Sequence, residues 1–110
     1  MDFTFNETQL MIRDMARKFA QEELAPTADE RDEREEFPHE AVKKMGELGF
    51  MGMMVSEQWG GAGLDTIAYV LAMEEISKVW ASLGVIVSVN NSLVCAPLLK
   101  FGSKAQKKKY

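Results

Sequence analysis

The chain has 110 residues, of which 46% are apolar and 27% are charged, and its formal net charge is −4. This length predicts one domain with enough apolar residues for a core. The charge has a local source, since residues 29–36 form an unbroken charged run of six acids and two bases. The charges of the remaining residues sum to zero, which excludes the broad basic face of a nucleic-acid binder.

The single Cys95 rules out an internal disulfide and suits a reducing compartment. Residues 1–6 have neither a basic region nor a long apolar run, so no signal peptide is predicted.

The first half of the chain reads as helices. Asn6 is predicted to cap a helix with Gln9 as its capping-box partner, and Pro26 ends or kinks that helix. A short charged helix or loop follows over residues 27–36. Pro38 fits the first position of another helix, and Gly49 its C-terminal stop. Residues 50–55 read either as a short strand without an obvious partner or, as we favour, as an extended segment on the core.

The second half begins with a glycine loop at residues 59–63, which predicts unusual backbone angles or close approach. Asp65 or Thr66 is predicted to cap the next helix, which runs to about Lys78. Its inward residues are expected to be Ile67, Val70, Leu71, Ile76 and Val79. Ser82 is predicted to cap a further helix and Gly102 to end it. Ser103 and Gln106 form a second capping box.

Residues 79–99 carry no charge at all, with Asn90 and Asn91 near the centre. The β-branched residues 85–89 suit a strand, but the length of the run and the lack of an alternating partner favour a buried helix. The run is long enough to span a bilayer, yet its amides, serines and Pro97 favour burial in a soluble core. The two buried amides must be hydrogen-bonded or face a polar group. One face of this helix is expected to carry Val85, Ile86, Val89 and Leu93, as ordinary core or as the wall of a slot for an apolar ligand.

No complete catalytic constellation is visible. The lone His39 is expected at the surface, and Cys95 is expected to be a small apolar group. Glu74 and Glu75 point about 100° apart on a helix, so a solvated pair or a salt bridge from Glu74 to Lys78 is favoured over acid–base catalysis. No Cys/His cluster has metal-ligand spacing. The glycine loop before a helix is a weak sign of phosphate binding, because it lacks both the dinucleotide and the P-loop spacing.

Several motifs occur in order along the whole chain: Phe5–Gln9, Leu24–Pro26, Glu57–Asp65, Ala72–Ser77, Gly84–Leu93 and Leu99–Lys107. Together they are similar to the N-terminal domain of acyl-CoA dehydrogenases, and most of all to the short-chain (butyryl-CoA) branch. The resemblance implies an all-α domain of about five to six helices over residues 1–110. A middle β domain and a C-terminal helical domain would be absent from this chain.

The resemblance also implies an FAD enzyme that oxidises the α,β bond of a short-chain acyl-CoA to the trans-2-enoyl-CoA. The base and most flavin contacts would lie in the missing domains, so we expect no catalytic residue, no tightly bound FAD and no activity from this chain alone. The implied substrate pocket is lined by Val85, Ile86, Val89 and Leu93. An apolar groove at Leu64 would receive electron-transfer flavoprotein.

The resemblance further implies that the full-length enzyme is a homotetramer without a membrane span. It would lie in the bacterial cytoplasm or, in a eukaryote, in the mitochondrial matrix. The alternatives are a non-catalytic helical module that binds a partner and an inert domain fragment.

Overall fold

The computed structural model describes residues 3–110, so Met1 and Asp2 of the N-terminal stretch lie outside the described residues. These residues contain helices and turns and no strand, which confirms the all-α prediction. The elements are α1 (Glu7–Phe19), η1 (Ala20–Leu24), α2 (Ala28–Glu33), α3 (His39–Glu47), η2 (Phe50–Gly52), η3 (Glu57–Trp59), α4 (Thr66–Val79), α5 (Ala81–Val89), η4 (Asn90–Cys95), α6 (Ala96–Phe101) and α7 (Lys104–Lys109). The π segments η1 and η4 continue the helices before them, and η2 and η3 are 3-10 turns.

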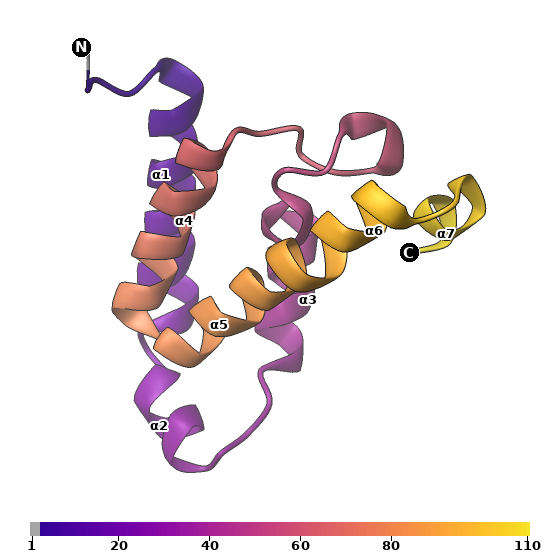
Figure 1. Ribbon diagram of the computed structural model, residues 1–110. Coiled ribbons are helices and arrows are strands. Elements are labelled where there is room, and N and C mark those ends of the chain that lie inside the picture. The colour runs from indigo at the N-terminus through magenta and orange to yellow at the C-terminus, as the bar shows by residue number, and fades with distance from the viewer. Residues whose placement is uncertain (1–2) are drawn as a thin grey trace.

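Helices α1 and α4 lie side by side and parallel, and the helix that begins with α5 leaves the end of α4 at an angle and continues through α6 (Figure 1). Gln9 donates to Asp65 across the first turns of α1 and α4, and Arg17 donates to Glu75 further along both helices. The two links keep the same order on each helix, which fixes the parallel direction. Between them the helices meet through small side chains, Ala16, Ala68 and Ala72, all with 1% exposure or less.

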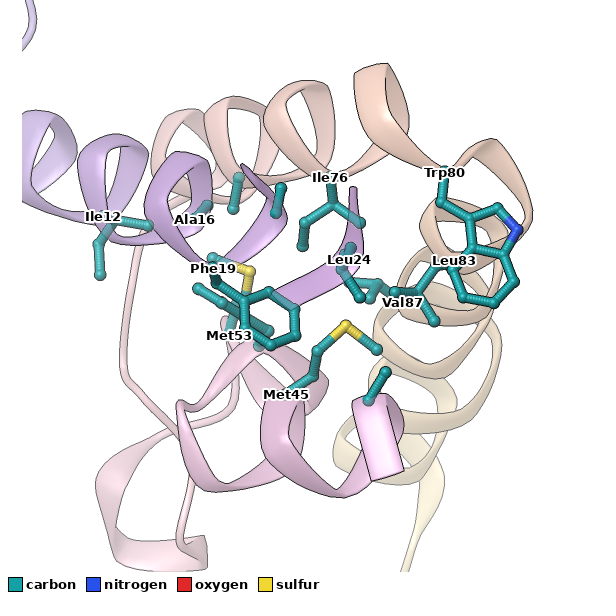
Figure 2. Close-up of a cluster of buried hydrophobic side chains, with 14 of the residues drawn as sticks. Ile12, Ala16, Phe19, Leu24, Met45, Met53, Ile76, Trp80, Leu83 and Val87 are labelled. Carbon is teal, nitrogen blue, oxygen red and sulfur yellow. The ribbon is translucent and has the colours of Figure 1, made fainter. Parts of the chain in front are cut away.

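The core forms where α1, α3, α4 and α5 converge (Figure 2). Its largest fully buried side chains come from five elements and from the residue that follows η2: Leu24, Met45, Phe50, Met53, Ile76, Leu83 and Val87. Phe19 and Phe50 pack ring against ring with centroids 6.1 Å apart. Burial of such side chains is the main favourable term in folding, so this cluster holds the helices together.

The predicted helix ends are largely confirmed. Both capping boxes form, with Asn6 and Gln9 at the start of α1 and with Ser103 and Gln106 at the start of α7. Asp65 caps α4 by accepting from the N–H of Ala68 at 2.8 Å. Gly49 follows α3 with φ +88°, a left-handed conformation that suits glycine.

Four local predictions are wrong. Residues 50–52 form a 3-10 turn instead of an extended segment. Ile67 and Val70 are about half exposed, because α4 turns its alanines and Ile76 toward α1 and the core. Ser82 lies inside α5, whose N-cap is Trp80, and its hydroxyl donates to Asp32 instead of capping. Pro38 is the N-cap of α3, one position before the predicted place.

The uncharged run is helical as predicted, but it is much less buried than its composition indicates. Residues 81–101 are apolar and long enough to cross a membrane, and 22% of the most apolar window is buried within the domain. Leu83, Gly84 and Val87 pack inward, whereas Val85 on the other side is 60% exposed. Only the inner side of this helix is therefore packed against the rest of the domain, where the sequence predicted a helix buried in the core.

Gly84 of α5 packs closely against Ser77 of α4. A Cβ added there would lie 2.2 Å from Ser77 Oγ and 3.2 Å from Ser77 Cβ. We therefore expect Gly84→Ala to lower the free energy of unfolding by about 1–3 kcal/mol, the usual cost of overpacking. Adding Ser77→Ala should restore part of the loss, because it removes the nearer atom.

Gly46 in α3 provides the matched control, since a Cβ there meets nothing within 4 Å. Gly46→Ala should stabilise the chain by about 0.5–1 kcal/mol through helix propensity. Urea denaturation of the three variants measures the differences. Equal effects at residues 46 and 84 would contradict the tight contact.

Candidate functional site

An exposed apolar strip runs along the helix formed by α5 and η4. It consists of Val85, Val89 and Leu93, which are 60%, 41% and 69% exposed. The fourth predicted pocket residue, Ile86, is partly buried and packs against the core at the edge of the strip. The structure thus brings three of the four residues together on an open face, which disfavours the reading of this face as ordinary core. A contiguous exposed apolar surface is typical of an interaction site.

The opposite side of the same helix is anchored by its two amides. Asn91 is 3% exposed, and its side chain accepts from Met53 N–H at 2.9 Å while donating to the carbonyls of Phe50 and Val87 at 2.9 and 2.8 Å. Asn90 donates to the carbonyl of Met51. The amides are therefore hydrogen-bonded, as predicted. Their partners lie in and directly after the 3-10 turn, in the segment that was predicted to be extended.

A groove of about 440 Å³ lies on the far side of Ile86. Its apolar floor includes Trp80 and Leu83, and three carboxylates, Asp32, Glu35 and Glu36, face it with one arginine, Arg31. The size suits a small molecule. The excess of negative charge disfavours an anionic ligand in this groove, for example one that carries a phosphate. The strip is therefore the better candidate for the wall of a ligand site.

The glycine loop is not a phosphate site. Its peptide N–H groups are already bonded within the domain: Gly60 to Glu57, Gly61 to Ser56, Ala62 to Gly52, Gly63 to Val55 and Leu64 to Met53. The helix that follows begins with the carboxylate of Asp65, whose pKa is lowered chiefly by the N–H of Ala68 and also by Gln9. A negative group at the helix N-terminus repels a second anion. These residues therefore do not fit the diphosphate of a dinucleotide cofactor.

The loop instead closes on residue 55. A Cβ at Gly61 would lie 2.2 Å from the Val55 carbonyl oxygen, and Gly60 and Gly63 have φ of +86° and +65°. Both predicted reasons for glycine, close approach and unusual angles, are confirmed.

Glu75 is the strongest electrostatic feature that the sequence did not reveal. Its side chain is 7% exposed and receives two hydrogen bonds from Arg17, at 2.9 and 3.2 Å. The bonds from Arg17 lower the pKa of Glu75, and Lys78 adds to the effect. An ionised, paired carboxylate is a poor general base, and Glu74 is exposed and lies 3.9 Å from Lys78 as predicted. Arg17 lies 58 positions before Glu75, so no local pattern could have linked them.

The remaining candidates play structural or surface parts. His39 is exposed, as predicted, beside the ring of Phe37. Cys95 is half-buried, which raises the pKa of its thiol and fits a small apolar group. Among residues 3–110, no group of three or more His, Cys, Asp or Glu side chains is placed to hold a metal.

The sequence predicts a partner groove at Leu64 and the helix that follows it. Leu64 is half-buried and packs against the core, and its N–H donates to the carbonyl of Met53. The helix that follows Leu64 exposes Ile67 and Val70. These three residues are the apolar side chains at the place where the sequence predicts a partner groove.

Residues 6–110 match the family model of the acyl-CoA dehydrogenase N-terminal domain. The chain is 56% identical over 104 residues to the mitochondrial short-chain specific acyl-CoA dehydrogenase of Sus scrofa, covering 94% of this chain and 25% of that one. It is 46% identical over all its 110 residues to the short-chain specific acyl-CoA dehydrogenase of Clostridium acetobutylicum, covering 29% of that protein. The chain thus spans about a quarter of the length of the curated relatives it matches.

Solved structures agree with these matches. Butyryl-CoA dehydrogenase from Megasphaera elsdenii superposes on all of this chain with a TM-score of 0.93 at 34% identity, over 30% of its own length. A chain in a structure described as the electron transferring flavoprotein of Acidaminococcus fermentans gives a TM-score of 0.96 at 47% identity, over all of this chain and 29% of that one.

The ion pair between Arg17 and Glu75 predicts a dependence of stability on pH. Because the folded-state pKa of Glu75 lies below its unfolded value of about 4.3, its stabilisation is present above that value and is lost as pH falls through the folded pKa. Glu75→Gln should therefore be less stable at neutral pH and lose less stability on acidification. Urea denaturation between pH 7 and roughly pH 3, on either side of the unfolded value, measures both slopes.

Glu74→Gln is the matched control, because Glu74 is exposed. It should leave the stability and its slope with pH nearly unchanged, as exposed pairs contribute little. Identical pH profiles for the two variants would contradict the role of the pair.

Proposed function

Because the chain belongs to the family of acyl-CoA dehydrogenase N-terminal domains, we propose that it is the N-terminal helical domain of an FAD-dependent short-chain acyl-CoA dehydrogenase. The parent enzyme oxidises the α,β bond of a short-chain acyl-CoA to the trans-2-enoyl-CoA. A middle β domain and a C-terminal helical domain lie outside these 110 residues in this proposal and supply the catalytic base. This chain supplies no catalytic residue.

The observation that carries the proposal is the exposed apolar strip. Val85, Val89 and Leu93 are exposed at successive four-residue spacings along one helix, and an acyl chain needs an apolar wall. With Ile86 at its edge, the strip forms one side of the acyl pocket. Its branched side chains limit the depth of that pocket and favour a short chain.

FAD is the cofactor of the proposed enzyme, and it supplies the hydride acceptor when bound. The glycine loop of this chain offers no free peptide N–H and places the carboxylate of Asp65 behind it. The flavin contacts are therefore assigned to the other domains.

Electron-transfer flavoprotein is the proposed partner, and its docking groove includes Leu64 with the exposed face of α4. The match to a chain in a structure described as an electron transferring flavoprotein supports this pairing. The full-length enzyme is proposed to be a homotetramer. Relatives in mitochondria and in bacteria support the mitochondrial matrix or the bacterial cytoplasm as its location.

The 110-residue chain alone should carry no flavin. After expression and gel filtration, its peak should show protein absorbance without the visible bands of a flavin, because the residues that hold FAD are assigned elsewhere. Addition of FAD should leave its melting temperature unchanged. A stoichiometric flavin peak would contradict the division of the site between domains.

The strip predicts how acyl specificity is set. In a full-length enzyme that carries this chain, Val89→Gly should deepen the pocket. The ratio of kcat/KM for hexanoyl-CoA to that for butyryl-CoA is expected to rise by about 10-fold, the lower end of what a methylene is worth in an apolar pocket. Steady-state kinetics with a series of acyl-CoAs measures the ratio.

Val70→Gly is the matched control, since Val70 is an exposed helical valine on α4, away from the strip. It carries the same helix-propensity cost, and because Val70 belongs to the face assigned to the partner, any effect on electron transfer is shared by both substrates and the ratio should stay unchanged. An unaltered ratio in Val89→Gly would reject the strip as the pocket wall.

A further inference from the structure

Directly after Val89, the helix that carries the strip contains a π-helical turn, in which each hydrogen bond spans one residue more than in an α-helix. In η4 the N–H of Ala96 donates to the carbonyl of Asn91, five residues before it, whereas an α-helix joins residues four apart. This wide turn separates Val89 from the end of the uncharged run. Single wide turns of this kind are rare and are frequent at functional sites.

The wide turn contains the best-bonded side chain of the helix, that of Asn91. The amide of Asn91 uses its oxygen and its nitrogen, with three hydrogen bonds of 2.8–2.9 Å to Met53, Phe50 and Val87. One of these bonds returns to its own helix, four residues back, and two reach the η2 turn. Aspartate can donate neither the bond to Phe50 nor the bond to Val87, and an apolar residue can form none of the three.

The wide turn also changes how the strip is aligned. In an α-helix of 3.6 residues per turn, each step of four residues overshoots a full turn by roughly 40°. Val85, Val89 and Leu93 are spaced by four, so an unbroken α-helix would turn Leu93 by about 80° away from Val85. A wider turn takes up part of that drift, and Leu93 remains 69% exposed, like Val85 at 60%.

We propose that Asn91 is a positioning residue, which holds the wide turn against the η2 turn and thereby keeps Leu93 in line with Val85 and Val89. The neighbouring Asn90 supports it through the carbonyl of Met51. The consequence for substrate choice rests on the proposed function, because only there does the strip bound an acyl chain.

The structural part is tested on the 110-residue chain by NMR. In the wild type, the side-chain amide protons of Asn91 should exchange slowly and show an NOE to the amide proton of Met53. In Asn91→Ser, the amide protons of Met53 and Ala96 should exchange at least about tenfold faster, the factor that one buried hydrogen bond of ordinary strength supplies. The methyl NOEs between Val89 and Leu93 should weaken.

Ser92→Ala is the matched control, because Ser92 is exposed on the same turn and bonds back to Ser88. It should leave the exchange of Met53 and Ala96 unchanged. Unchanged exchange at Ala96 in Asn91→Ser would overturn the proposal. If that variant does not fold, fast exchange of the Asn91 amide in the wild type still overturns it, and slow exchange with the NOE supports it.

The functional part uses a full-length enzyme that carries this chain. A merely structural role of Asn91 would lower kcat/KM for all acyl-CoAs in proportion to the loss of folded protein. A positioning role changes the ratio of kcat/KM for hexanoyl-CoA to that for butyryl-CoA by at least about threefold when the folded fractions are equal. This is less than the discrimination that one whole methylene group supplies in an apolar pocket. An unchanged ratio in Asn91→Ser, together with a changed ratio in Val89→Gly, overturns the positioning role and leaves the proposed function intact. Unchanged ratios in both variants reject the pocket wall itself.

Discussion

The contact between two amide side chains and one 3-10 turn is the constraint on which the rest of this structure depends. Asn91 and Asn90 bond the peptide groups of residues 50–53, a segment that has no strand to pair with. A buried peptide group without a partner is costly, and these amides supply partners for the N–H of Met53 and the carbonyls of Phe50 and Met51, while the glycine loop bonds the carbonyls of Gly52 and Met53. The same bonds fix which side of the uncharged helix faces the core.

Fixing the inner side of the helix leaves its outer side open. Leu83 and Val87 then pack beside the turn, and the strip of Val85, Val89 and Leu93 faces away from the domain. The net charge gathers in the separate run at residues 29–36, part of which faces the groove beyond Ile86. Apolar and acidic surfaces are thereby kept apart on the two sides of one helix, which suits an acyl chain on the strip and disfavours phosphate in the groove.

The parallel pair of α1 and α4 supplies the platform for this arrangement. Gln9 serves twice, in the capping box with Asn6 and in the bond to Asp65, so the start of α1 is joined to the start of α4. Further along, the ion pair between Arg17 and Glu75 joins the helices again over their small alanines. Glu75, for which the sequence favoured a solvated or salt-bridged carboxylate over acid–base catalysis, is thus a buried structural link.

The sequence by itself determined the class of fold, most helix ends and the family. Capping boxes, glycine stops and charge-free runs depend on neighbours a few positions apart. The helix ends predicted at Asn6, Gly49, Asp65 and Ser103 therefore form in the structure. Only the tertiary structure decided which apolar residues are exposed, how residues 50–53 are bonded and whom Glu75 pairs with. Those outcomes depend on partners about 40 to 60 positions away. Composition alone cannot tell a helix that is buried all round from one that buries one side and leaves the other exposed.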